Sequence, residues 1–495
     1  MLNICRTVTA GVMLVIGISL LSTFQTIYEA IVNSNGYIKN GTTYYKSWKT
    51  PSKSYNIYMN YYFFNITNPD GVMNGEKPDL KEVGPISYIE IQNKVDIAFL
   101  NDNSAVRYYE NRTFIYSPET STFSEDDELT LLNLPFWIIY QTGFATTRLF
   151  PLMLTIQFNP FFPQNIKLFQ PIYRISPKKL IWGYRDPTLV FLNKVLPSVI
   201  TFTEFGLFIG KNATSNGQFK VDTGVKNDNK NRGLIETWKG GEMLSIWANH
   251  QSNMINGTDG KTFPTFMNSE NSIYAFITDV CRSFYLNPEE TPIKVNNVLT
   301  TKYSVPTQAF SSGINSSYTK GFCTPNSRFC SLDGVFNITN CMIIPYLELG
   351  ASFRMNMFMS LPHFLYADPS YINGVNGMNP VKENHEIHIN IHRSSGLALS
   401  GSQRAQFNYL IQKNKQYPKS PFYMEKFTED AIMFPLVWID EKADANTSLM
   451  SMVKHEIILL YTVGFAVLTL LTVFSVIFLL LNCIELYFKL KIHNC

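Results

Sequence analysis

Four cysteines in the central part of the chain are the side chains with the most definite chemistry. They are Cys281, Cys323, Cys330 and Cys341, and an even number of them fits two disulfides formed in an oxidising compartment. Four cysteines allow three pairings, and the residues alone leave all three open, although Cys323 and Cys330 could close a small loop. No C-x-x-C pair occurs, which argues against a structural zinc site.

Three histidines, His385, His388 and His392, are spaced as a metal-binding set could be. A second interpretation explains the same spacing. His388, Asn390 and His392 alternate with isoleucines, so they would form the polar, solvated face of a strand whose other face packs inward. The H-E-x-x-H zinc motif fails, because residue 389 is isoleucine. We therefore favour the strand and expect no metal.

Nothing in the sequence nominates an enzyme. The G-x-S-x-G elbow, the GxxxxGK[ST] phosphate loop and the GxGxxG fingerprint are all absent, so we expect neither catalysis nor a cofactor. A formal charge of only +3 over 495 residues argues against nucleic acid as a partner. An aromatic content of 14% with only 16% charged residues excludes an intrinsically disordered chain.

Two uncharged stretches, 8–27 and 457–481, are each long enough for a helix to cross about 30 Å of hydrocarbon. A cleaved signal peptide is the alternative for the first, but the stretch is longer than the usual apolar region and no A-x-A-like site follows closely. Arg6, Lys489 and Lys491 flank the stretches on the outside and predict that both tails face the cytosol. The predicted division is a tail at 1–7, a span at 8–30, an extracellular or lumenal ectodomain at 31–455, a span at 456–481 and a tail at 482–495.

The ectodomain is predicted to be rich in strands. Short runs of Tyr, Phe, Ile and Val are separated by Asn, Gly and Pro, as at Tyr55–Ile66, 86–91 and 106–116. Residues 129–170 differ, because two charges and four prolines in this apolar segment predict short helices instead of a span. The segment is either ordinary core or an exposed apolar cap that meets lipid or a protein partner. The candidate ligand-contacting residues of this cap are Phe136, Trp137, Arg148, Phe158 and Lys167.

Possible modification and sorting signals lie in the ectodomain and in the tails. N-x-S/T sequons number about what chance gives in a chain so rich in Asn, Ser and Thr, and they are consistent with a glycosylated ectodomain. The sequons are at Asn40, Asn65, Asn111, Asn212, Asn256, Asn315, Asn337 and Asn446. Tyr487 and Leu490 delimit a tyrosine-based sorting signal, with a juxtamembrane helix end as the alternative. Cys5, Cys483 and Cys495 are candidates for S-acylation, with unmodified thiols as the alternative.

Six runs of residues lie between the two predicted spans. They are YFFNITNPDGVMNGEKPDLKEVGP (62–85), LIWGYRDP (180–187), INGTDG (255–260), DVCRS (279–283), FCT (322–324) and LPHFLYADP (361–369). Together, and in this order, they resemble the class B scavenger receptors, which include a fatty-acid translocase, a high-density-lipoprotein receptor and a lysosomal integral membrane protein. The resemblance covers the whole chain.

The resemblance implies a fold. Two terminal transmembrane helices would flank a large mixed β+α ectodomain with an antiparallel β-barrel core, a helical apex at about 129–170 and an internal lipid tunnel. The resemblance also implies the disulfides Cys281–Cys341 and Cys323–Cys330. The translocase has a third bridge, whose half-cystines would fall near Gln251 and Gly321; neither is cysteine here.

The implied function is that of a membrane glycoprotein that binds lipids or lipoprotein-like particles and transfers fatty acid, sterol or sterol ester through its tunnel. It would reside in the plasma membrane or in lysosomal or phagosomal membranes. The alternative is a lysosomal or phagosomal membrane protein that carries protein cargo at its apex or exports lipid. Two features depart from the family. Residues 129–170 contain no histidine, unlike the pH-sensing apex of the lysosomal member, and Arg148 and Lys167 are their only basic residues. Lys167 lies near the position of the translocase's apical lysine.

Overall fold

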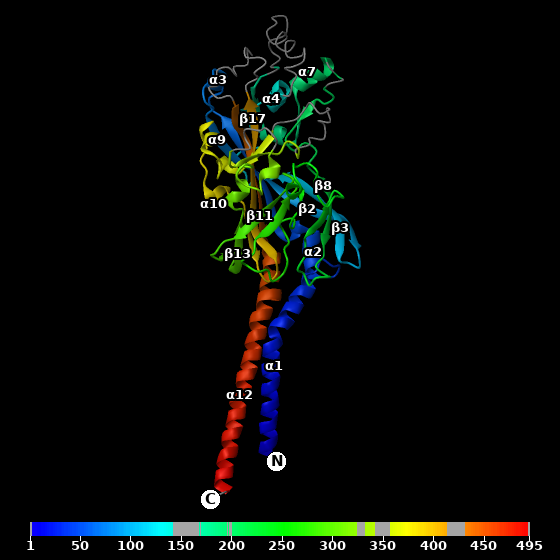
Figure 1. Cartoon of the computed structure of the whole chain (residues 1–495), viewed down its shortest axis with the longest axis vertical. Coiled ribbons are helices and arrows are strands. Elements are labelled where there is room, and N and C mark those ends of the chain that lie inside the picture. The colour runs from blue at the N-terminus through cyan, green and yellow to red at the C-terminus, as the bar shows by residue number, and fades with distance from the viewer. Residues whose placement is uncertain are drawn as a thin grey trace.

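The computed structural model places two long helices side by side beneath a β-rich domain (Figure 1). Both chain ends lie at the extremity far from the domain, and α4 and α7 lie at the opposite extremity. The structure describes residues 2–141, 168, 170–195, 197, 200–323, 332–341, 357–412 and 431–493. The helical stem meets the domain on the side opposite α4 and α7 (Figure 1).

The two stem helices are α1 (Leu2–Gly36) and α12 (Leu460–His493), and a π-helical segment at Val453–Leu459 leads into the second. Arg6–Gly36 and Thr447–Lys489 are long and apolar enough to cross a membrane. This confirms the two terminal apolar helices predicted from the sequence. The helices touch closely, because a Cβ on Gly17 would lie 2.9 Å from Thr472 Oγ1. A small residue at such a contact lets two helix backbones approach in lipid.

The remaining elements belong to the ectodomain. The helices are α2 (Thr43–Lys49), α3 (Pro69–Met73), α4 (Leu134–Gln141), α6 (Pro177–Trp182), α7 (Pro187–Val195), α8 (His250–Asn253), α9 (Pro369–Asn373), α10 (Lys382–His385) and α11 (Thr447–Met452). The strands are β1 (Tyr55–Ile66), β2 (Leu80–Leu100), β3 (Ala105–Tyr116), β4 (Leu129–Leu132), β5 (Ile172–Ile175), β6 (Tyr184–Arg185), β7 (Glu204–Phe205), β8 (Thr214–Asp222), β9 (Ile235–Trp238), β10 (Ile273–Ile277), β11 (Arg282–Pro288), β12 (Ile293–Val295), β13 (Val298–Ser304), β14 (Val335–Asn337), β15 (Met357–Ser360), β16 (His388–His392), β17 (Leu397–Gln412) and β18 (Ala431–Ala445).

Most of these strands form one antiparallel sheet. Its order is β10-β11-β13-β16-β17-β18-β1-β2-β3-β8-β9, with β12, β14 and β15 attached beside this path. Burial along β1 alternates between buried and more exposed residues, as expected for a strand with one face toward the core. The mixed β+α ectodomain with an antiparallel sheet is thus confirmed. The path of paired strands has two ends, β10 and β9, so these pairings do not by themselves form a closed barrel.

Strand β16 differs from its predicted form. The strand exists, but Asn390 and His392 are only 5% and 8% exposed, so the predicted solvated polar face is wrong. The reason is position in the sheet, because β16 lies between β13 and β17. Asn390 donates a hydrogen bond to Ser400 Oγ, and His392 Nδ1 lies 2.9 Å from Ser395 Oγ. Among the described residues no group of His, Cys, Asp and Glu is placed to hold a metal ion.

A disulfide joins Cys281, in the turn between β10 and β11, to Cys341, which follows β14. This is the pairing that the resemblance implies. Cys323 is also disulfide-bonded, and Cys330, its partner in the expected pairing, lies outside the described residues. The Cys281–Cys341 bridge closes a chain segment with a sequence separation of 60 residues. Such a long loop makes a cross-link effective at restricting the unfolded chain.

We predict that replacing Cys281 and Cys341 together with serine lowers the free energy of unfolding by about 4 kcal/mol, because the unfolded chain regains the freedom of this loop. Chemical denaturation of the purified full chain measures the change. Peptide mapping without reduction checks the pairing, and a linkage of Cys281 to Cys323 would contradict it.

Candidate functional site

A cavity lies inside the ectodomain, against the inward faces of β1, β17 and β18. Its volume is about 110 Å³, below the roughly 300–1,000 Å³ usual for small-molecule sites. We refer to it as the interior cavity. Most of its wall is apolar, including Ile57, Phe276, Phe284 and Leu286. A wall of this kind suits a hydrocarbon ligand better than a polar one.

Two further cavities adjoin the interior cavity. One, here called the upper cavity, has a volume of about 40 Å³ and shares Ile277, Gln403 and Glu441 with it. The other, here called the side cavity, has a volume of about 660 Å³ and shares Phe263 with it. The three cavities therefore adjoin one another in a row through shared wall residues.

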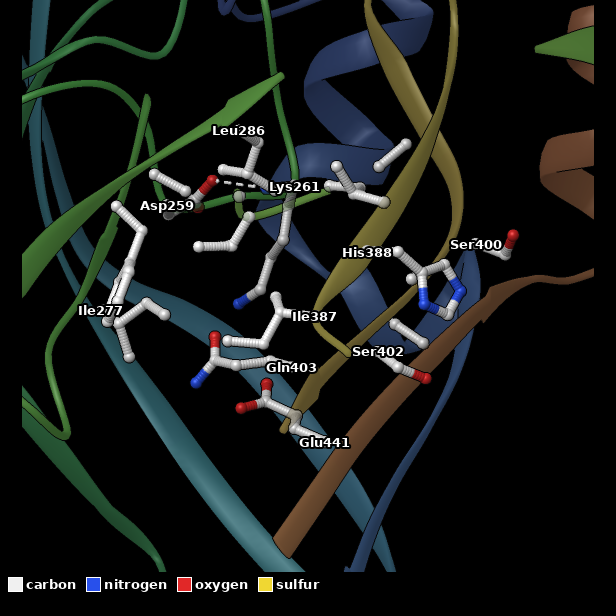
Figure 2. A pocket seen from close by; sticks show the side chains of 18 of the residues that line it. Asp259, Lys261, Ile277, Leu286, Ile387, His388, Ser400, Ser402, Gln403 and Glu441 are labelled. Atoms are coloured by element: carbon white, nitrogen blue, oxygen red, sulfur yellow. Dashed lines mark hydrogen bonds between the residues drawn. The ribbon is translucent and has the colours of Figure 1, made fainter. Parts of the chain in front are cut away.

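Polar side chains interrupt the apolar wall where the interior and upper cavities meet. Figure 2 shows Lys261, Gln403 and Glu441 gathered on one side of the strands, whereas the His388 ring points away from them. Gln403 and Glu441 are directly paired across β17 and β18, which places their side chains on the same face. Lys261 arrives from the segment that precedes β10. The sheet register thus creates this polar group.

Arg112 of β3 lies behind this polar group and binds three carboxylates. Its Nε is 2.5 Å from Glu90 Oε1, its Nη1 is 3.0 Å from Asp279 Oδ2, and its Nη2 is 3.2 Å from Glu441 Oε2. Burial lowers the pKa of Arg112, but Glu90, Glu441 and Asp279 together outweigh burial and raise it above its ordinary value. The guanidinium is therefore charged, and it is outnumbered by carboxylates.

A second ion-pair group lies beside the first and is balanced. Lys261 Nζ is 2.7 Å from Glu110 Oε1, and Lys94 Nζ is 2.6 Å from Glu110 Oε2 and 4.0 Å from Asp259. Burial alone would raise the pKa of Glu110, but Lys261 and Lys94 lower it well below its usual range. Glu110 therefore stays ionised, and the charge of Lys261 already has a partner.

Glu441 is the carboxylate that faces both the interior and the upper cavity. Burial raises the pKa of Glu441 to about 7, the nearby Glu90 carboxylate adds to the rise, and Arg112 opposes it. Gln92 Nε2 donates a long hydrogen bond of 3.4 Å to Glu441 Oε1. An amphipathic molecule in the interior cavity would thus have hydrocarbon walls along its chain and one polar group that can meet its head.

Of the predicted apical residues, the structure describes Phe136 and Trp137, and both are buried. Phe136 is 0% and Trp137 4% exposed, and Trp137 Nε1 donates a 2.9 Å hydrogen bond to Pro171 O. The exposed cap is therefore wrong for these two residues, because α4 packs its apolar side chains into the main core beneath it. Arg148, Phe158 and Lys167 lie outside the described residues.

The sequons and the tail residues are placed only in part. Asn40, Asn212 and Asn315 are exposed. The other sequons, Asn65, Asn111, Asn256, Asn337 and Asn446, are half-buried. Tyr487 is 61% exposed on α12, and Leu490 lies on the same helix. Cys483 is an exposed free thiol, the structure gives Cys5 only a helical backbone, and Cys495 lies outside the described residues.

The polar group of the cavity, formed by Lys261, Gln403 and Glu441, was not predicted from the sequence. A signal for it does exist, because Asp440 and Glu441 interrupt an otherwise apolar run that ends in Leu436, Val437 and Ile439. Charged residues inside such a run indicate either the end of a strand or a buried pair. The alternation along a strand does not say which of two adjacent carboxylates faces inward.

Three histidines of the ectodomain, two buried and one half-buried, make it sensitive to acid. Burial lowers the pKa of His385, His388 and His392 to about 4, from an ordinary value of 6.5. The unfolded chain therefore binds more protons than the folded chain between these values, and stability falls as pH falls from 6.5 to 4. The raised pKa values of Glu441, Asp186 and Asp440 act in the opposite sense, because their folded forms take up a proton first, whereas the lowered pKa of Glu110 acts in the same sense as the histidines.

We predict that the unfolding temperature of the full chain falls steadily from about pH 7 to about pH 5. Replacing His392 with Gln should reduce the slope of the unfolding free energy by up to about 1.4 kcal/mol per pH unit. Replacing the exposed Gln251 with Asn, a change that removes no titratable group, is the control and should leave the slope unchanged. An unfolding temperature that stays level or rises on acidification would contradict the burial of these rings.

Comparison with known proteins agrees with the family resemblance seen in the sequence. The model of the CD36 family matches residues 8–486. The chain is 28% identical over 495 residues to Lysosome membrane protein 2 of Rattus norvegicus, covering 97% of this chain and 95% of that protein. It is 30% identical over 437 residues to Scavenger receptor class B member 1 of Rattus norvegicus, covering 86% of this chain and 78% of that one. From one terminal helix to the other, the chain therefore belongs to the CD36 family, that of the class B scavenger receptors.

Proposed function

We propose that the chain is a two-span membrane receptor that binds lipids or lipoprotein-like particles and passes lipid through its ectodomain to the membrane. The row of three adjoining cavities carries this proposal, because the interior and upper cavities have largely apolar walls inside a domain otherwise surrounded by water. Each methylene of a lipid kept out of water is stabilised by about 0.8 kcal/mol. The similarity to Scavenger receptor class B member 1 supports the same function.

A closed barrel around the route is the second part of the proposal. A short segment, residues 257–258, lies between the two end strands of the sheet, β9 and β10, and is hydrogen-bonded to both. Ile235 N donates to Gly257 O at 2.9 Å, and Phe276 N donates to Thr258 O at 2.9 Å. These backbone hydrogen bonds supply the missing link between the two ends of the strand path and support an enclosed tunnel.

The route would end near the membrane stem. Pro264 and Met267 line the side cavity, and Phe266 between them packs its ring 5.8 Å from the ring of Tyr28 on α1. Lipid leaving the side cavity would therefore meet the surface of α1, whose apolar side chains lead into the predicted span. We place the receiving bilayer at this helix.

The proposed topology puts both tails in the cytosol, because Arg6 and Lys489 lie at the outer ends of the two helices. The ectodomain is then extracellular or lumenal. The exposed Asn40, Asn212 and Asn315 are the proposed glycan sites with the best access. Cys483 is the proposed acylation site, since its thiol is exposed and free at the cytosolic end of α12.

A second candidate function is that of a lysosomal or phagosomal membrane protein that carries cargo or exports lipid. The similarity to Lysosome membrane protein 2 favours this candidate. Tyr487 and Leu490 would be its sorting signal, although both lie within helix α12. Imaging the tagged chain against markers of the cell surface and of lysosomes separates the two candidates.

We predict that replacing Ala443 with Trp blocks the route. Ala443 lines the interior cavity beside Ile57 and Gly401, so an indole would fill space that a lipid chain needs. Transfer of a fluorescent sterol from donor vesicles into expressing cells should fall at least about tenfold, as expected when contacts to two methylenes are lost.

The matched control for the blocked route is the replacement of Lys442 with Trp. Lys442 is the neighbouring residue on β18, and its side chain is 50% exposed on the other face. Both variants must reach the cell surface in equal amounts. Undiminished transfer by the Ala443→Trp variant would contradict a route through the interior cavity.

A further inference from the structure

The junction between the interior and upper cavities carries an excess of negative charge. Arg112 is one cation among the three carboxylates of Glu90, Asp279 and Glu441. When all are ionised, this group has a net charge of −2. Any lipid moving between the two cavities passes the Glu441 carboxylate, because this residue belongs to both walls.

The cations on the walls do not offset this excess. Among the described residues that line the two cavities, the cations are Lys261 and Arg404. Lys261 Nζ already lies 2.7 Å from Glu110, and Arg404 Nε lies 3.5 Å from Asp440. An ionised carboxylate entering the junction would therefore face repulsion from Glu441 without an unpaired cation to receive it.

Hydrogen-bonding capacity at the junction is available. Gln403 is half-buried, lines both cavities, and its side-chain amide has no hydrogen-bond partner among the described residues. An amide offers both a donor and an acceptor, and the Glu441 carboxylate offers acceptors. A hydroxyl between the two could donate its proton to Glu441 Oε and accept a hydrogen bond from Gln403 Nε2. Hydrogen bonds to a charged acceptor are among the strongest that proteins make.

We propose that Glu441 and Gln403 select lipids by their head group, so that the junction accepts a neutral head that donates a hydrogen bond and rejects an ionised carboxylate. This inference rests on the proposed function, because it assigns a specificity to the same route. It makes a lipid alcohol, including a sterol with a free hydroxyl, the preferred cargo, and it makes Glu441 the residue that determines the preference.

The surroundings of Glu441 set the condition for the test. The charged and polar groups that face it are Glu90 and Gln92 of β2, Arg112 of β3, Gln403 of β17, Asp279 after β10 and Lys261 before it. Because burial raises the pKa of Glu441 to about 7, binding is measured at about pH 8, where Glu441 and a fatty acid are both ionised.

The probes are oleyl alcohol and oleate, which have the same chain and differ only in the head group. Each labelled lipid is incubated with the full-length chain in detergent, and retained lipid is measured after gel filtration. The Ala443→Trp variant supplies the background of lipid held outside the interior cavity. The wild-type chain should retain oleyl alcohol at least about tenfold better than oleate, as one unfavourable charge contact would give.

Two variants move the preference in opposite directions. Glu441→Gln removes the charge and keeps the shape, so the ratio of alcohol to oleate should fall to about threefold or less, whereas Gln403→Glu adds a charge and should raise it. Asp444→Asn is the matched control, because it removes a carboxylate from the exposed face of the same strand. It should keep the wild-type ratio.

The possible outcomes separate the inference from the proposed function. Equal retention of the two lipids by the wild-type chain, or an unchanged ratio in both Glu441→Gln and Gln403→Glu, overturns the inference and leaves the route intact. Retention of neither lipid above the Ala443→Trp background overturns the route itself, and the inference with it. A ratio that falls in Glu441→Gln and rises in Gln403→Glu supports both.

Discussion

The pairing of Arg112 with three carboxylates joins parts of the ectodomain that are far apart in the sequence. It connects β3 to Glu90 on β2, to Glu441 on β18 and to Asp279 in the turn after β10. Taking such charges out of water is costly, and the structure tolerates them because each has a partner. Removing one partner of a buried ion pair typically costs about 3 to 5 kcal/mol. The shape of the domain interior therefore depends on this contact.

The same ion pairs explain why apolar side chains do not fill the whole interior of the domain. An apolar core would close around side chains such as Phe284 and Leu286, but charged groups on the inward faces of β2, β3 and β18 keep the middle of the domain polar. Apolar cavities remain on either side of the ion pairs. The Cys281–Cys341 bridge begins two residues after Asp279 and ties this turn to the chain that follows β14. The disulfide and the Arg112–Asp279 ion pair thus fix the cavity wall at the turn between β10 and β11.

The sequence predicts what depends on local pattern and fails where long-range pairing decides. The two apolar stretches and the strand Tyr55–Ile66 are confirmed because length, charge and alternation are local properties. Alternation in 388–392 predicts a strand correctly, but it cannot reveal that β13 and β17 flank it and bury Asn390 and His392. For the same reason Phe136 and Trp137 looked like cap residues, although tertiary packing places them in the core. Glu441 faces the interior cavity and the buried Asp440 faces the other side of the sheet, and this depends on the register with β1 and β17.

The most direct measurement of the central claim is the site at which a lipid contacts the chain. A sterol or fatty alcohol with a photoreactive group on its hydrocarbon part is bound to the full-length chain, irradiated and located by peptide mapping. The account predicts adducts on the cavity-lining parts of β10, β17 and β18, such as Ile277, Gln403 and Ala443, and their loss in the Ala443→Trp variant. Adducts confined to α1 and α12 would contradict it, because the lipid would then reach only the membrane-spanning helices.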